Sequence, residues 1–316
     1  MIDVVNLSKS YGTTRAVTEL SFRVEPGQIL GLLGPNGAGK TTTMRIITGY
    51  LAPTRGQVLI NGTDITNDPS AKRRMGYLPE FAPLYQEMLV LDLLQFAAAV
   101  RQVPRGARRG RLQEMARVCG LAEVMHRPFR ELSRGYKQRA GLAYALISDP
   151  DFLILDEPTS GLDPNQIVEI RAIIREIGRK RTVIFSTHIL SEAESTCDRI
   201  IIINRGRVVA DGTAADVKRS AATGVVIRAT LLGTNPTEAA TALTAIADVV
   251  RATKVAVGEG DPPQAVALLI ECRRDVRSEI YQVVKNRDWI VLEMSSAARS
   301  LEQVFQQLTA TAGAEG

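Results

Sequence analysis

The sequence predicts an α/β protein of two domains, in which an open parallel sheet with helices precedes a small α+β domain. Three observations support this prediction. A glycine-rich loop joins an apolar strand to a helix, a second apolar strand ends in two carboxylates, and a β-α-β-β-α-β pattern begins beyond Gly212. The 316 residues suffice for about two domains with substantial cores. We place the domain boundary between residues 1–218 and residues 219–316.

The glycine-rich loop follows the pattern G-x-x-x-x-G-K-[ST], with a buried strand at residues 28–33 before it and a helix at Thr42–Thr48 after it. Glycines let backbone N–H groups turn inward around a triphosphate, and the helix N-terminus also favours anions. Lys40 can reach the β- and γ-phosphates, and the Thr41 hydroxyl can hold Mg²⁺. The sequence therefore predicts that the whole loop binds a nucleoside triphosphate: Gly34, Pro35, Asn36, Gly37, Ala38, Gly39, Lys40, Thr41 and Thr42.

The two carboxylates follow the apolar strand predicted at residues 151–155. Ligands of an open parallel sheet bind at the carboxyl ends of its strands, so Asp156 and Glu157 should lie at the nucleotide. Asp156 would hold Mg²⁺, directly or through water, and Glu157 would face the water that attacks the γ-phosphate. With the loop upstream, this pair predicts that the bound nucleotide is hydrolysed.

Further motifs lie in order within residues 1 to about 218. They are an aromatic residue, a serine-glycine segment before a helix, a loop and a histidine after a strand: Tyr11, Leu132–Tyr136, Ser160–Asp163 and His188. Together with the loop and the carboxylates, this set resembles the ATP-binding subunits of ABC transporters. In that family these motifs are the aromatic residue that stacks on adenine, the LSGGQ signature, the D-loop and the switch histidine.

The resemblance implies a P-loop NTPase of the ABC type with a helical subdomain at about residues 81–147. It also implies ATP and Mg²⁺ as cofactors, and ATP hydrolysis at composite sites of a head-to-tail dimer, either a homodimer or a pair with a related ATPase. ATP would lie between the phosphate loop of one subunit and Ser133 and Gly135 of the other. His188 would contact the γ-phosphate and the attacking water, and Asp163 would place the D-loop at the interface.

The motif spacing and the run Glu157–Pro164 look most like the ATPases of ABC-2-type exporters, including the group linked to gliding motility. This resemblance implies a separate integral-membrane ABC-2-type permease as partner and no nucleic acid. It places the chain in the cytoplasm, peripheral on the cytoplasmic face of the cell membrane. The transported substrate stays open, because the permease selects it.

Two helices begin at residues suited to capping. Ser133 is a good N-cap before a helix at residues 134–147, whose N-terminus favours anions. Asp163 is a good N-cap before Pro164, and the helix that follows carries an isoleucine stripe typical of a core-facing surface. His126 is interpreted as structural.

The chain departs from the family pattern at two places. Glu80, in the loop after a predicted strand, stands where the family has Gln; a carboxylate can also contact Mg²⁺ and water, so we keep Glu80 as a site residue. In the signature, Arg134 and Tyr136 replace Gly and Gln. Arg134 either adds charge near the γ-phosphate or points to solvent.

The region at residues 81–130 is expected to be a helical insertion, with a helix at Leu89–Arg101 and a basic loop at residues 101–109. A solvated face is favoured over membrane contact for these arginines. In the second domain we expect strands at residues 225–232, 249–257, 265–271 and 289–292, helices at 236–246 and 276–285, and an amphipathic tail segment at 301–308. Its order is that of the ferredoxin-like motif.

Composition is that of an ordinary soluble globular protein, with 45% hydrophobic and 23% charged residues and a net charge of +5. No apolar run reaches the roughly 18 residues of a membrane span, and no signal peptide is recognised. The three cysteines match neither a disulfide framework nor a metal site, and reduced thiols are expected. Two rival functions, a nucleic-acid or translation factor and a regulatory module without turnover, lack support: the chain has no second cassette or zinc-type cysteine pairs, and its catalytic residues are intact.

Overall fold

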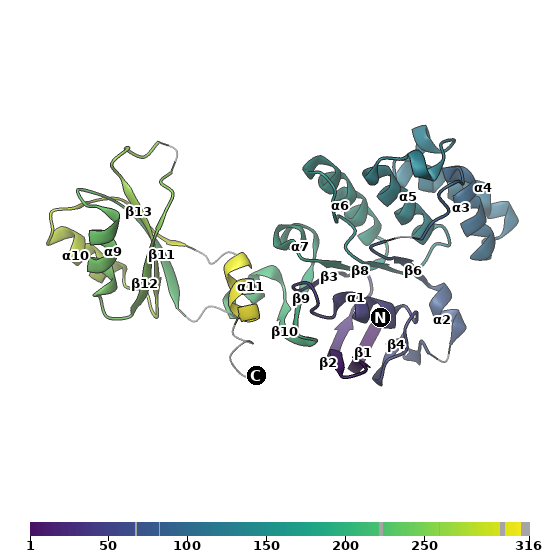
Figure 1. The fold of residues 1–316 in the computed structure, drawn as a ribbon, viewed down its shortest axis with the longest axis horizontal. Helices are drawn as coiled ribbons and strands as arrows, with labels where there is room; N and C mark the ends of the chain where they lie inside the picture. Colours follow the sequence, from purple (N-terminus) through teal and green to yellow (C-terminus); the bar gives the residue numbers. More distant parts are fainter. Residues whose placement is uncertain (67, 82, 221–223, 259, 298–300, 311–316) are drawn as a thin grey trace. The chain divides into compact units, whose positions relative to one another are not determined.

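The computed structural model describes residues 1–316 except 67, 82, 221–223, 259, 298–300 and 311–316. It divides into two compact units (Figure 1). Unit 1 comprises Met1–Val217 together with Leu308–Ala310, and unit 2 comprises Lys218–Gln307. The sequence placed the end of the chain in the second domain, whereas Leu308–Ala310 group with unit 1. There the side-chain amide of Asn204 donates a hydrogen bond to the carbonyl oxygen of Thr309 at 3.2 Å.

The centre of unit 1 is a six-stranded sheet in the order β10-β9-β3-β8-β7-β6, in which only β10 is antiparallel to its neighbour. Its strands are β3 (Ile29–Leu33), β6 (Met75–Leu78), β7 (Phe152–Leu155), β8 (Thr182–Thr187), β9 (Arg199–Asn204) and β10 (Arg207–Gly212). Every residue of β3, β7 and β8 is buried, as expected for strands covered on both faces. The three strands that the sequence predicted around the site are confirmed.

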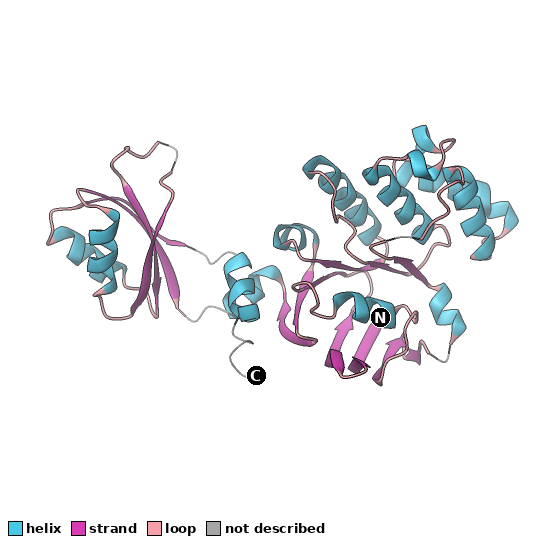
Figure 2. Cartoon of the chain, in the orientation of Figure 1, coloured by secondary structure: helices cyan, strands magenta, loops and turns pink. Residues whose placement is uncertain are grey.

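The two faces of this sheet belong to two hydrophobic cores. Alternate residues of β7 illustrate this, because Leu153 and Leu155 pack with the helices on one face whereas Phe152 and Ile154 pack on the other. On that second face, α1 (Lys40–Ile47) lies between the central sheet and an antiparallel sheet, β2-β1-β4-β5 (Figure 2). This second sheet, which the sequence analysis did not anticipate, consists of β1 (Ile2–Tyr11), β2 (Thr14–Val24), β4 (Arg55–Ile60) and β5 (Thr63–Asp64).

The first face carries most of the helices of unit 1. Besides α1, the helices of the unit are α2 (Pro69–Arg73), α3 (Val90–Val100), α4 (Arg105–Val118), α5 (Arg134–Leu146), α6 (Pro164–Gly178) and α7 (Leu190–Thr196), with short 3-10 turns η1 (Ala122–Val124) and η2 (Phe129–Glu131). Helix α8 (Ala214–Ser220) begins in unit 1 and ends in unit 2. No helix among the described residues combines the length and the apolar character that crossing a membrane requires.

The expectation of a basic loop at residues 101–109 is wrong from Arg105 onward, because α4 begins there. Pro104 occupies the N-cap, where its lack of an N–H group costs nothing, and α4 then continues for 14 residues. Two glycines, Gly106 and Gly110, lower its intrinsic helix propensity and hid it from a pattern-based prediction. Met115 is the one residue of α4 that is fully buried. Its arginines differ: Arg105 and Arg109 are exposed, whereas Arg111 is largely buried and donates hydrogen bonds to the carbonyl oxygens of Leu146 and Ile147.

Unit 2 has the predicted order β-α-β-β-α-β: β11 (Val225–Leu232), α9 (Pro236–Thr244), β12 (Val249–Val255), β13 (Val266–Cys272), α10 (Arg277–Lys285) and β14 (Ile290–Ala297). Its strands form an antiparallel sheet in the order β12-β13-β11-β14, the arrangement of the ferredoxin-like split motif. Apolar residues of α9 and α10 pack against alternate residues of β11 and β13. The last helix, α11, covers Leu301–Ala310.

Candidate active site

The glycine-rich loop leaves β3 and leads directly into α1. Gly39 is the N-cap of α1 and has φ 105°, a left-handed conformation that favours glycine. A Cβ atom at Gly34 would lie 2.3 Å from the carbonyl oxygen of Ile203, so this turn also excludes a side chain. The buried Lys40 ammonium donates hydrogen bonds to the carbonyl oxygens of Gly34 at 2.7 Å and Pro35 at 3.3 Å. The loop is therefore closed around its own lysine.

Asp156 follows β7 and is buried, with 1% of its surface exposed. Its Oδ1 atom accepts hydrogen bonds from the Ser186 hydroxyl at 2.7 Å and the Thr41 hydroxyl at 3.2 Å. Its Oδ2 atom is buried and has no hydrogen-bond partner among the described residues. A buried carboxylate oxygen without a partner is costly, and a cation beside the Thr41 hydroxyl would satisfy it. Thr41 and Asp156 thus fit a Mg²⁺ site that depends on substrate phosphates for its other ligands.

Glu157 lies between two other predicted site residues. Its Oε1 atom is 3.4 Å from the ammonium of Lys40, and its Oε2 atom is 2.8 Å from Nδ1 of His188. Its backbone N–H donates to the Ser186 hydroxyl at 2.9 Å, and its φ of 49° is in the left-handed region that non-glycine residues rarely adopt. The carboxylate is nearly buried, whereas His188 is half exposed. One strained residue thus connects the glycine-rich loop with the end of β8.

The residues of the signature and D-loop segments occupy a second region. Ser133 caps α5, accepting from the Tyr136 N–H at 3.4 Å, and Asp163 caps α6, accepting from the Gln166 N–H at 3.0 Å. Both capping predictions are confirmed. A Cβ atom at Gly135 would lie 2.7 Å from the Gln166 side chain, so the N-termini of α5 and α6 lie together.

Arg134 links these two segments. A Cβ atom at Gly161 would lie 2.2 Å from the guanidinium of Arg134, so this side chain lies directly over the D-loop. Gly161 has φ 67°, and a glycine is therefore required there both for its backbone and for the space it leaves. Within the described chain, no hydrogen bond or ion pair joins Ser133, Gly135 or Asp163 to Lys40.

Tyr11 and Glu80 are the remaining predicted residues. Tyr11 ends β1 and is 48% exposed, and the Lys9 ammonium is 5.5 Å from its ring centroid. Glu80 is exposed and lies two residues beyond β6, the neighbour of β7 in the sheet. The Asp156 N–H donates to the carbonyl oxygen of Leu78 at 2.8 Å, so Glu80 follows a strand that ends at the same sheet edge.

Sequence reasoning missed several polar residues near this edge. Ser186 binds both Asp156 and the backbone of Glu157, and its position at the end of an apolar strand was the available signal. Tyr77, on β6, is also close: burial, followed by the charge of Asp156, raises the pKa of its hydroxyl to about 12. Nothing in the motif patterns distinguished these residues from structural ones.

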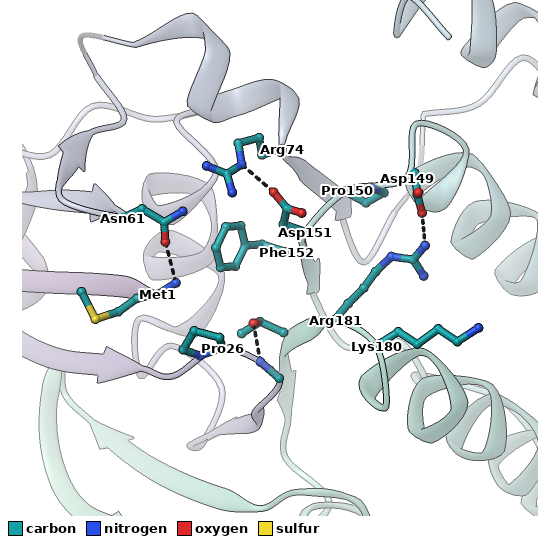
Figure 3. A pocket seen from close by; sticks show the side chains of 12 residues that line it. Met1, Pro26, Asn61, Arg74, Asp149, Pro150, Asp151, Phe152, Lys180 and Arg181 are labelled. Atoms are coloured by element: carbon teal, nitrogen blue, oxygen red, sulfur yellow. Dashed lines mark hydrogen bonds and ion pairs between the residues drawn. The ribbon is translucent and has the colours of Figure 1, made fainter. Parts of the chain in front are cut away.

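A cavity of about 470 Å³ lies at the opposite edge of the sheet, beside the first residues of β7 and β8 (Figure 3). Four of its charged side chains form two ion pairs, Arg74 with Asp151 at 2.5 Å and Arg181 with Asp149. None of the predicted site residues lines this cavity. The cavity is therefore separate from the candidate active site.

Comparisons with known proteins identify the family of this chain. A family model described as ABC transporter matches residues 17–160. The ABC transporter ATP-binding protein YxlF of Bacillus subtilis is 38% identical over 225 residues, which are 71% of this chain and 75% of YxlF. The Nod factor export ATP-binding protein I of Rhizobium etli is 40% identical over 68% of this chain and 69% of that protein. The molybdate/tungstate import ATP-binding protein WtpC of Pyrococcus horikoshii is 38% identical over 69% of this chain and 63% of that protein.

A solved structure, that of the ATP-binding subunit of an ABC transporter, superposes with a TM-score of 0.64 and 33% identity over 70% of this chain and 92% of that one. The similarity in sequence, the shared fold and the ordered motifs agree with one another. This chain belongs to the family of ABC transporter ATP-binding proteins.

Proposed function

We propose that this ABC ATPase hydrolyses Mg-ATP at composite sites of a head-to-tail dimer and thereby drives export through a separate ABC-2-type permease. The observation that carries the proposal is the position of the Glu157 carboxylate, which lies between the ammonium of Lys40 and the ring of His188. Transfer of a phosphoryl group to water needs a cation at the phosphates and a group that orients the water. This cluster supplies both at one sheet edge.

Binding of ATP would use the backbone of residues 34–42 and the side chain of Lys40. The loop N–H groups and the N-terminus of α1 would hold the phosphates, and Lys40 would exchange its bonds to the loop carbonyls for bonds to the β- and γ-phosphates. Tyr11 is exposed at the end of β1 and free to stack on the adenine.

Mg²⁺ would be held by the Thr41 hydroxyl and Asp156, with Glu80 as a further oxygen ligand from the neighbouring loop. The partnerless Oδ2 atom of Asp156 supports this assignment. When bound, Mg²⁺ neutralises charge on the β- and γ-phosphate oxygens. Among the described residues no three His, Cys, Asp or Glu side chains converge on one point, which agrees with a site completed by phosphate and water.

Glu157 would act as the general base or water-positioning group. Lys40 holds one of its carboxylate oxygens and His188 the other, so the carboxylate has a defined orientation before the water arrives. In the tautomer that carries hydrogen on Nδ1, His188 donates to Glu157 and leaves Nε2 as an acceptor for the attacking water.

Glu157→Gln tests this role. The amide cannot take a proton from water, so we expect kcat to fall by roughly 10²- to 10⁴-fold while ATP still binds. Single-turnover hydrolysis and ATP titration of the purified chain measure the two effects separately. Glu176→Gln, an exposed change on α6, is the matched control. Hydrolysis by Glu157→Gln at close to the normal rate would show that the assignment is wrong.

The dimer follows from the separation of the two anion-binding regions. The N-terminus of α5, capped by Ser133, is a second site suited to phosphate, and one nucleotide in one chain has no use for both. In a head-to-tail pair, Ser133 and Gly135 of one copy would complete the site around Lys40 of the other. Arg134 lies over Gly161, so the signature and the D-loop would reach the partner as one unit.

Ser133→Arg tests the dimer, because it adds bulk and charge at the signature and leaves the phosphate loop of its own chain unchanged. We expect a monomer that still binds ATP but neither dimerises with ATP nor hydrolyses it. Light scattering with and without ATP reports the association. Mixing this variant with Lys40→Ala should restore at most one working site per heterodimer. Full activity of Ser133→Arg alone would contradict the head-to-tail arrangement.

The permease and the direction of transport form the last part of the proposal. One relative is named for export and another for import, so the case for export rests on the resemblance of the run Glu157–Pro164 to ABC-2-type exporter ATPases. We place the chain on the cytoplasmic face of the membrane, where ATP is available. Reconstitution with an ABC-2-type permease encoded beside it should stimulate hydrolysis several-fold. An unchanged rate would contradict the pairing.

A further inference from the structure

Glu192 is a buried carboxylate that none of the roles above uses. It lies on α7 and has only 2% of its surface exposed. Its Oε2 atom accepts two hydrogen bonds, from the Thr159 hydroxyl at 2.8 Å and from the Thr187 hydroxyl at 2.8 Å. Its Oε1 atom is buried and has no hydrogen-bond partner among the described residues.

The two threonines stand on the segments that carry the catalytic pair. Thr159 is two residues after Glu157 and directly precedes the D-loop, whereas Thr187 ends β8 and directly precedes His188. Both threonines are buried. The Thr187 hydroxyl also accepts from the N–H of Ile189 at 3.0 Å, so the backbone on both sides of His188 is tied to the same hydroxyl. Glu192 therefore joins the two segments whose ends meet at the bond between Glu157 and His188.

The energetics argue against Glu192 as a stabiliser of the fold. Burying a carboxylate is costly, and here the compensation comes from two neutral hydroxyl groups, with no ion pair to Glu192 among the described residues. Apolar residues of similar size would hold three buried segments together at lower cost. The carboxylate instead constrains geometry. Its Oε2 atom must lie within hydrogen-bond distance of both hydroxyls at once, so it fixes their positions relative to each other.

We propose that Glu192 is a positioning residue for ATP hydrolysis, which holds the segment after Glu157 and the segment before His188 in fixed register. This proposal rests on the roles proposed above for Glu157 and His188, since the Glu192 carboxylate makes no hydrogen bond to either of them. A displacement of about 1 Å in a catalytic group can cost roughly 100-fold in rate, even when the change is remote from the chemistry. Substrate binding by the phosphate loop does not depend on this register.

Glu192→Ala in the full chain is the first test. We expect kcat to fall by about 10- to 100-fold while KM for ATP stays within about 3-fold, since the lost interaction affects the transition state more than the bound ground state. ATP titration counts the sites that bind ATP, and kcat is calculated per such site, so that unfolded protein does not lower it. Glu194→Ala removes an exposed carboxylate from the same helix and serves as the matched control, with kcat expected within about 2-fold.

Rescue and coupling distinguish positioning from a general loss of packing. Glu192→Gln keeps an oxygen that can accept from both hydroxyls, and it should restore kcat to within about 5-fold of the normal value. Thr187→Val and Thr159→Val each remove one donor with little change in shape. If Glu192 acts through these hydroxyls, adding either change to Glu192→Ala should lower kcat much less than the same change does alone.

Two results would overturn the inference. A normal kcat per competent site in Glu192→Ala would show that the carboxylate is not needed for positioning, and so would losses that add fully in the double variants. Glu157→Gln, measured alongside, separates this outcome from a failure of the proposed function. If Glu157→Gln abolishes turnover and Glu192→Ala does not, the catalytic assignment stands and the positioning role is wrong.

Discussion

The two units bury different kinds of side chain. Both have continuous apolar cores, but unit 1 also buries four charged residues close to the ends of its central strands: Lys40, Asp156, Glu157 and Glu192. In the described part of unit 2, the only fully buried polar side chain is that of Thr230. Its ion pairs lie on the surface, as between Arg274 and Asp248 at 2.9 Å.

This difference shows where the molecule buries charged groups at a cost in folding free energy. Buried charges without full compensation destabilise a fold, and perturbed or strained groups gather at functional sites. In unit 1 both carboxylate oxygens that are buried without a hydrogen-bond partner, on Asp156 and Glu192, lie near one sheet edge together with the left-handed backbone of Glu157, whereas the one such polar atom described in unit 2 is the Thr230 hydroxyl. Unit 2 shows no such concentration among its described residues. We therefore expect the chemistry to depend on unit 1 alone.

The strongest test of this contrast compares two lysines. Lys40→Ala should weaken ATP binding by roughly 10- to 100-fold and nearly abolish hydrolysis, because a charged hydrogen bond to phosphate contributes about 1.5–3 kcal/mol already in the ground state. Lys285→Ala, an exposed change on α10 of unit 2, should leave both quantities within about 2-fold. Calorimetric titration with ATP and a phosphate-release assay measure them. Equal losses from the two changes would remove the distinction between the units.

The second test uses the core of unit 2. Leu268 is fully buried between the sheet and its helices, so Leu268→Ala should destabilise this unit by about 2–5 kcal/mol. If the units fold separately, as we propose, hydrolysis should stay within about 2-fold at temperatures where unit 1 is folded. Ile154→Ala, the matched change in β7, should lower stability and activity together. Thermal unfolding and the hydrolysis rate, followed in parallel, decide this.

A loss of hydrolysis in step with the unfolding of Leu268→Ala would show that the units share their stability. The end of α11 makes this outcome worth testing. Thr309 lies beside Asn204 of β9, so a segment that follows unit 2 in sequence belongs to unit 1.

The sequence predicted much of the fold because its signals were local. The strands around the site are continuous apolar runs, and Ser133 and Asp163 are caps that can be recognised without tertiary information. Unit 2 was predicted element by element, and its order β-α-β-β-α-β is confirmed. The antiparallel sheet of β1, β2 and β4 was missed, and the partly exposed faces of these strands carry several bulges that weaken the alternating pattern.

Only the site residues that belong to a recognised sequence motif could be predicted, and their mutual geometry could not. The pairing of Glu157 with both Lys40 and His188 depends on three chain segments, and no spacing in the sequence specifies which oxygen faces which partner. The two hydrogen bonds that join Glu192 to Thr159 and Thr187 could not be predicted for the same reason. From the sequence alone, a glutamate in a short helix is expected to be solvated, whereas the structure shows that Glu192 is buried.

The smallest expected effect concerns the cysteines, which test burial in both units without touching the chemistry. Burial raises the pKa of the Cys119 thiol in unit 1 to about 12 and that of Cys272 in unit 2 to about 11, and it raises the pKa of Cys197 as well. Because the thiolate is the reactive form, these shifts lower its fraction at pH 8 by roughly 100-fold or more. A raised folded-state pKa also means that the stabilisation is complete below the pKa of the unfolded thiol and is lost as the pH rises, between about 9 and 11 for Cys272.

Alkylation with iodoacetamide at pH 8, read by mass spectrometry, should therefore leave all three thiols of the native chain intact while the urea-unfolded chain reacts fully. As the pH rises towards 11, Cys272 should react before Cys119, because its thiol ionises at the lower pH. Hydrolysis measured before that point should be unchanged, since no cysteine lies among the site residues. Rapid labelling of Cys119 at pH 8 would contradict this prediction most directly, because it would mean that the buried core of unit 1 in which this thiol lies is open at that pH.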